Sequence, residues 1–160
     1  GWIVMNKDLM PKYSVMKQSA DVHSDNLTQH IVAKFMAEYN IDEHVNKIRK
    51  VYRKRENVMM AAIEKYFPAG VNYSHPQGGL FIWVEVPGDV DTIKLFNTCI
   101  KHNVAFVPGE PFYPDKVTPG TFRLNYSNMS EEQIQTGIER LGSAIKETID
   151  QNQTTRVAQH

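Results

Sequence analysis

The residue whose type and setting most clearly suit binding chemistry is Arg123, in the run 122–127 (FRLNYS). Apolar and polar residues alternate in this run, which predicts a β-strand with one buried face and one polar face. An arginine held in mid-strand has little freedom, and its planar fork can bind a carboxylate or phosphate through two parallel hydrogen bonds. The other interpretation is an arginine on a solvated sheet face, and the strand alone favours it, because most strand arginines face water.

Other patterns that could support catalysis or metal binding are weak. His23 and His30 are seven residues apart, and no carboxylate pair stands at ligand spacing, so no metal site is predicted. Gly78 and Gly79 lead into a strand rather than a helix, which favours a close backbone approach over a phosphate loop. No motif anchors Ser-His-Asp chemistry. Cys99 falls on the inward face of a predicted helix, and we interpret it as a core residue, not a nucleophile.

The bulk composition excludes several classes of partner. Lys+Arg and Asp+Glu are equal at 18 each, so no net charge favours nucleic acid or an anionic membrane. A basic face on the helix predicted at 42–67 has no interleaved aromatic residues, and we interpret it as solvated. It consists of Lys47, Arg49, Lys50, Arg53, Lys54 and Arg55. No apolar run approaches the roughly 18 residues that span a membrane. The single cysteine fits a reducing, cytoplasmic location.

The elements that must position Arg123 lie in the second half of the chain. They are expected as a strand at 80–86, a helix at 91–102, a strand at 104–107, a loop at 110–120, the Arg123 strand and a helix at 130–149. The loop contains three prolines and should be stiff. The last helix opens on a capping box, Ser130 to Gln133, and Asp91 caps the earlier one. This order predicts an α/β (α+β) sandwich, with a small mixed sheet and helices on one side.

The first half is expected to be helical after its opening residues. Helices are predicted from Asp8, with Pro11 in the first turn, from Ser24 or Asp25 to about residue 40, and over 42–67. Residues 1–5 (GWIVM) read as a buried strand for which the neighbouring sequence offers no partner. We therefore expect the chain to be part of a longer protein, and residues 150–160 to form a polar tail.

Three segments in this order resemble the C-terminal part of pyridoxal-phosphate (PLP)-dependent aminotransferases of fold type I, class I/II. They are 76–83 (PQGGLFIW), 103–109 (NVAFVPG) followed by Phe112, and 122–127. The chain looks most like the aminoadipate aminotransferase-like group, which includes effector domains of MocR-type regulators. The resemblance implies that 1–41 is the end of a large PLP-binding domain, 42–68 an interdomain helix, 69–150 the small C-terminal domain and 151–160 a polar tail.

The resemblance also implies roles for particular residues. The family's arginine at the position of Arg123 binds the substrate α-carboxylate, and the implied pocket residues are Pro108, Gly109, Phe112, Gly78 and Gly79. The family's Schiff-base lysine and other cofactor-holding residues precede its Gly-Trp motif, so no catalytic residue is expected in this chain. It should bind no PLP and be inactive alone, with exposed apolar surface that leads to a swapped or non-native dimer.

For the longer protein, the resemblance implies a cytoplasmic, homodimeric enzyme that moves an amino group from an α-amino acid to a 2-oxo acid. One alternative is the effector-sensing domain of a GntR/MocR-type transcriptional regulator. A third possibility is a free-standing binding module, against which the unpaired strand at residues 1–5 argues.

Overall fold

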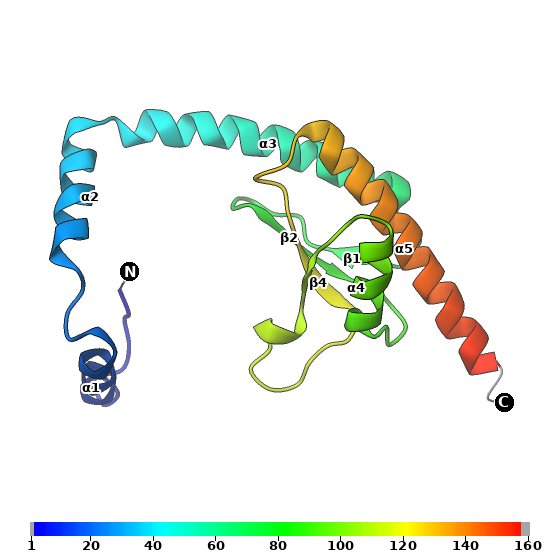
Figure 1. The fold of residues 1–160 in the computed structure, drawn as a ribbon, viewed down its shortest axis with the longest axis horizontal. Coiled ribbons are helices and arrows are strands. Elements are labelled where there is room, and N and C mark those ends of the chain that lie inside the picture. The colour runs from blue at the N-terminus through cyan, green and yellow to red at the C-terminus, as the bar shows by residue number, and fades with distance from the viewer. Residues whose placement is uncertain (1, 158–160) are drawn as a thin grey trace. The chain divides into compact units, whose positions relative to one another are not determined.

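The computed structural model describes residues 2–157 and divides the chain into two compact units, Gly1–Val45 and Asn46–His160. We call them the N-terminal unit and the C-terminal unit (Figure 1). The division falls within the longest helix of the first half, α3 (Ile41–Tyr66).

The N-terminal unit contains α1 (Met10–Asp21), α2 (Asn26–Glu38) and the first residues of α3. As predicted, Asp25 caps α2: its carboxylate accepts hydrogen bonds from the backbone N–H groups of Leu27 (3.0 Å) and Thr28 (3.1 Å). The predicted cap of α1 is wrong, because Leu9 occupies that position without a side-chain bond. Asp8 instead lies in the preceding turn, where its N–H donates to Asn6 Oδ1 (3.1 Å).

The strand predicted at residues 1–5 is also wrong over its described part, Trp2–Met5; Gly1 lies outside the described residues. The side chains of Trp2 and Val4 are 90% and 89% exposed. A strand needs a neighbour for its backbone hydrogen bonds, and none of the described residues provides one. Neither α1 nor α2 contains a buried residue. The apolar positions along α2 are all exposed, among them Leu27, Ile31, Val32, Phe35 and Met36.

The C-terminal unit is built on a four-stranded sheet with the order β1-β2-β4-β3. The strands are β1 (Asn72–Tyr73), β2 (Phe81–Glu85), β3 (Val107–Pro108) and β4 (Thr121–Asn125). All three pairings are antiparallel. The α/β class is confirmed, but the sheet is not mixed as predicted, because β4 is inserted between β2 and β3, which run in the same direction. The predictions also missed β1 and made β3 too long.

The hydrophobic core lies on one face of the sheet, between the strands and the helices that are seen beside them in Figure 1. Ile82 and Val84 of β2 and Phe122 and Leu124 of β4 are buried, which confirms the predicted inward residues of the last strand. Most of the rest of the cluster comes from α3, α4 (Thr92–Lys101) and α5 (Glu131–Val157). These helices contribute Met59, Ala62, Ile63, Leu95, Cys99, Ile134, Ile138, Leu141, Ala144 and Ile145.

The last helix, α5, begins at the predicted capping box. The Gln133 N–H donates to Ser130 Oγ (3.2 Å), and the Ser130 N–H donates to Gln133 Oε1 (3.0 Å). The helix continues to Val157, past the point where a polar tail was predicted; residues 158–160 lie outside the described residues. A Cβ added at Gly142 would collide with the Tyr66 carbonyl oxygen, so α3 and α5 are in close contact there.

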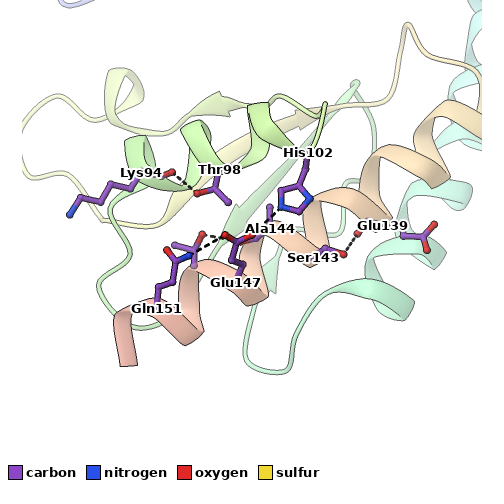
Figure 2. A network of polar contacts seen from close by, with 9 residues as sticks. Lys94, Thr98, His102, Glu139, Ser143, Ala144, Glu147 and Gln151 are labelled. Atoms are coloured by element: carbon purple, nitrogen blue, oxygen red, sulfur yellow. Dashed lines mark hydrogen bonds and ion pairs between the residues drawn. The ribbon is translucent and has the colours of Figure 1, made fainter. Parts of the chain in front are cut away.

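A second packing surface joins α4 and α5. The predicted cap is confirmed: Asp91 Oδ1 accepts from the N–H groups of Ile93 and Lys94, both at 3.0 Å. On α4, Leu95 and Cys99 are fully buried, whereas Ile100 is 49% exposed. Figure 2 shows the polar contacts at the rim, where His102 Nε2 lies 3.0 Å from Glu147 Oε2.

Candidate functional site

Arg123 lies in the middle of β4, opposite Trp83 of β2 and Val107 of β3. Its neighbours along the strand, Phe122 and Leu124, are buried in the core. Because side chains alternate along a strand, Arg123 belongs to the opposite face, which carries no helix of the core cluster. The side chain is half-buried. The structure therefore places the arginine on a sheet face that its surroundings only partly cover.

Two aromatic rings lie against the guanidinium. Its central carbon, Cζ, is 3.9 Å from the ring centroid of Phe81 and 4.6 Å from that of Phe112. We call Phe81 and Phe112 the ring pair. Phe81 comes from β2, and Phe112 comes from η1 (Glu110–Phe112), a short 3₁₀ helix in the loop before β4. A guanidinium over an aromatic face is attracted by the ring's electrons, so both contacts are favourable.

The charge of Arg123 is not paired with a carboxylate of the described residues. Among the described residues, no salt bridge or hydrogen bond reaches this guanidinium. Its Nε atom is buried and has no acceptor. An unpaired buried donor is costly, whereas a carboxylate could take two of the N–H groups at once. Such a guanidinium is suited to binding an anion, and to planar carboxylates above all.

A second buried polar atom without a partner among the described residues is Glu110 Oε2, in η1. Glu110 stands two residues before Phe112. No salt bridge between Glu110 and Arg123 is present in the described part of the chain. The carboxylate therefore leaves the positive charge of Arg123 available.

Three of the five implied pocket residues, Pro108, Gly109 and Phe112, lie in η1 or directly before it. Phe112 touches Arg123, as described above. Pro108 pairs with Phe122 in the β3–β4 ladder, and the Gly109 N–H donates to the Thr121 carbonyl (2.8 Å). A Cβ at Gly109 would lie 2.7 Å from that oxygen, so only glycine allows this approach. Pro108 and Gly109 thus fix the loop that carries Phe112.

Among the described residues, no hydrogen bond, ion pair or ring contact joins Gly78 or Gly79 to Arg123. Both are exposed, and a Cβ added at either would meet nothing within 4 Å. The predicted close backbone approach is therefore not found here. Gly79 has a φ of +86°, a conformation that side chains rarely adopt, and this explains a glycine at the turn into β2.

The sequence did not single out Phe81, Trp83 or Glu110. The Trp83 ring is edge-on to Phe112 (5.8 Å between centroids, 83° between planes) and lies 6.1 Å from that of Tyr113. Residues 80–86 read as one apolar run, so nothing marked Phe81 and Trp83 as outward-facing. Their role depends on the register between β2 and β4, which no local pattern specifies.

The remaining sequence expectations concern residues away from this face. Cys99 is buried, and desolvation raises the pKa of its thiol to about 12, which confirms that it is a core residue. The residues that the structure describes contain no group of three or more potential metal ligands. In the same residues, no helix is long and apolar enough to cross a membrane.

Part of the basic face of α3 makes contacts within the chain. Lys54 Nζ lies 2.8 Å from Glu131 Oε1 at the start of α5, and Arg55 donates to the Ser127 carbonyl just after β4. Lys47, Arg49, Lys50 and Arg53 are exposed.

The comparisons with known proteins point to one family. Residues 1–141 match the family model described as aminotransferase class I and II. A 2-aminoadipate transaminase of Thermus thermophilus is 36% identical over 143 residues, which cover 89% of this chain and 36% of that protein. The crystal structure of Pyrococcus horikoshii kynurenine aminotransferase in complex with PMP is 36% identical, with a TM-score of 0.78. That match covers 88% of this chain and 35% of the other.

A transcriptional regulator is also related. The uncharacterized HTH-type transcriptional regulator YdfD of Bacillus subtilis is 27% identical over 148 residues, which cover 92% of this chain and 30% of the regulator. The chain thus spans about a third of the length of the relatives that it matches.

Proposed function

The chain belongs to the class I and II aminotransferase family, and on that premise we propose that it is the C-terminal part of a PLP-dependent amino acid aminotransferase. In this proposal Arg123 binds the α-carboxylate of the substrate, and the whole protein moves an amino group from an α-amino acid to a 2-oxo acid. Residues 1–41, 42–68, 69–150 and 151–160 keep their proposed roles as the end of the large domain, interdomain helix, small domain and tail.

The observation that carries the proposal is the unpaired guanidinium of Arg123. It is half-buried against two rings, its Nε is buried without an acceptor, and no described carboxylate reaches it. A structural arginine in such a place would be expected to have an ion-pair partner in its own chain. A substrate carboxylate would provide the missing acceptors through charge-assisted hydrogen bonds.

The cofactor itself does not fit the residues described here. In the family, PLP is the electron sink for the reaction, and the protein must hold it beside the substrate. Every lysine of the described residues is exposed, whereas a lysine that forms a Schiff base works best when it is desolvated. We therefore propose that the cofactor-holding residues belong to another part of the longer protein, and that this chain alone is inactive.

The regulator alternative is supported by the Bacillus subtilis relative. In that case the same site would bind an effector, and a DNA-binding domain elsewhere in the longer protein would respond. An amino-transfer assay of the full-length protein, run beside a DNA-binding assay, separates the two functions.

The assembly and location of the longer protein belong to the same proposal. The exposed apolar side chains of α1 and α2 support burial against further protein, and we propose that the full-length protein is a homodimer. Sedimentation of the full-length protein as a monomer at micromolar concentration would contradict this. A cytoplasmic location is supported only by the single, buried cysteine.

Substitution of Arg123 in the full-length protein tests the proposed role. Arg123→Lys keeps the charge but loses the bidentate fork, so we expect the KM for the amino donor to rise about ten-fold. Arg123→Gln removes the charge and should raise KM further, by about 100-fold. Arg140→Lys is the matched control, because Arg140 is exposed on α5 and, among the residues that the structure describes, donates only to the Asn103 carbonyl (3.4 Å). Unchanged kinetics in Arg123→Gln would contradict the proposal.

A further inference from the structure

We propose that Phe81 and Phe112 are positioning residues for this site, which hold the plane of the Arg123 guanidinium so that its fork is preset for a carboxylate. The inference rests on the proposed function and extends it, because it names the side chains that fix the orientation of Arg123. Neither phenylalanine is proposed to touch the reacting atoms.

The ring pair contacts Arg123 from two different elements of the chain. The two ring centroids lie 3.9 Å and 4.6 Å from Cζ of Arg123, and they come from elements about thirty residues apart in the sequence. A free arginine side chain samples many rotamers, and binding that must freeze them is weakened accordingly. Two rings stacked against the guanidinium restrict these rotamers before the ligand arrives.

The ring pair is itself held by contacts with β4 and its neighbours. Phe81 is on β2, the strand that pairs with β4, and Trp83, opposite Arg123, is edge-on to Phe112. The Phe112 N–H donates to the Gly109 carbonyl (3.0 Å), while Gly109 is bonded to Thr121 of β4. Both rings are thus tied to the strand that carries Arg123, which fixes their distance from it.

An aromatic ring and a carboxylate have different electrostatic effects on a guanidinium. A carboxylate partner would hold Arg123 by occupying its N–H groups, and would compete with any ligand for them. An aromatic face attracts the guanidinium but leaves the in-plane N–H groups free. The ring pair therefore orders the arginine without neutralising it, and this distinguishes a positioning role from an ordinary structural ion pair.

A double-mutant cycle in the full-length protein tests the inference. The variants are Phe112→Leu, Arg123→Lys and the double variant. The probe is the best amino donor from a panel of the common α-amino acids, kynurenine and 2-aminoadipate. We expect Phe112→Leu to raise KM about five-fold with little change in kcat, from loss of the cation–π contact. In the Arg123→Lys background the same change should alter KM by less than about two-fold, since the fork is already lost.

Two further variants separate positioning from general stability. Phe112→Tyr keeps the ring face and should restore KM to within about two-fold of the wild type. Phe96→Leu removes a ring that lies edge-on to Phe106 in the hydrophobic core, with 5.5 Å between the two ring centroids. This variant should lower the melting temperature but leave KM unchanged.

If Phe112→Leu raises KM by the same factor in the wild type and in Arg123→Lys, the inference is overturned, because Phe112 would then act independently of Arg123. An unchanged KM in folded Phe112→Leu would overturn it as well. If Arg123→Lys alone leaves KM unchanged, the proposed carboxylate role fails instead, so the two failures can be told apart.

Discussion

The two units of this chain use the same local devices to begin helices but differ completely in burial. Asp25 caps α2 and Asp91 caps α4 through the same pair of backbone N–H bonds. Along α2, Ile31 and Phe35 remain 59% and 47% exposed, whereas Leu141 and Ile145 of α5 are fully buried. Caps and periodicity determine where a helix begins, but only packing against other elements determines what its apolar face does.

The site lies in the unit that has a core. The backbone of Arg123 is fixed by pairing with β2 and β3, and its strand neighbours Phe122 and Leu124 are buried in the core on the opposite face. The N-terminal unit has no comparable framework, because neither α1 nor α2 buries a residue among those that the structure describes. A preset binding group therefore belongs to the C-terminal unit.

The largest effect should come from paired core and surface truncations in the 160-residue chain. Leu141→Ala removes a fully buried side chain and should cost about 2–5 kcal/mol of unfolding free energy. Ile31→Ala, at a position that is 59% exposed, should change it by less than about 0.5 kcal/mol. Urea unfolding followed by circular dichroism measures both. A comparable loss in Ile31→Ala would show that α2 is packed in solution, and would remove the contrast between the units.

Substitution of a helix cap in the C-terminal unit should have an effect of intermediate size on the free energy of unfolding. Asp91→Ala removes the acceptor of two backbone N–H groups at the start of α4 and should cost about 1 kcal/mol. Asp91→Asn retains the acceptor and should cost much less. Urea unfolding of the two variants side by side gives the difference, and equal stabilities would mean that the cap contributes nothing.

The equivalent cap in the N-terminal unit should depend on pH. The side-chain and backbone hydrogen bonds from Thr28, followed by that from Leu27, lower the pKa of Asp25 from its ordinary value of 3.8. A carboxylate whose pKa is lowered by folding stabilises the folded state fully at pH values above its unfolded-state pKa. This stabilisation is lost as the pH falls through its folded-state pKa. Amide protection in α2 should therefore be constant above pH 3.8 and decline below it. Asp25→Asn caps without titrating, and its protection should stay flat.

The smallest effect should come from the rim of α4 and α5. His102 Nε2 lies 3.0 Å from Glu147 Oε2, a contact that is an ion pair when the imidazole is protonated, and Gln151 Nε2 donates to the other oxygen of Glu147 (3.1 Å), as Figure 2 shows. Their side chains are 36% and 46% exposed, so Glu147→Gln should cost less than about 1 kcal/mol. Unfolding at low and high salt should show the difference shrinking as salt rises. A larger, salt-independent loss would mean that this rim belongs to the core.

Much of the C-terminal unit could be predicted because its signals are local. The alternation around Arg123, the Asp91 cap and the Ser130 capping box each depend on residues within a few positions. The sequence could not show that β4 lies between β2 and β3, nor that Phe81 meets Arg123, because both depend on long-range register. The strand expected at residues 1–5 failed for a related reason: an apolar run becomes a strand only where a partner strand exists.

The proposed binding of the α-carboxylate by Arg123 can be tested by one ratio of rate constants. In the full-length protein, kcat/KM is measured for the best amino donor and for its α-carboxamide, in the wild type and in Arg123→Gln. The carboxamide keeps the side chain and amino group but lacks the negative charge. We expect the wild type to prefer the acid by about 100-fold or more, and this preference to fall to within about ten-fold in Arg123→Gln. An undiminished preference in the variant would show that another group binds the carboxylate.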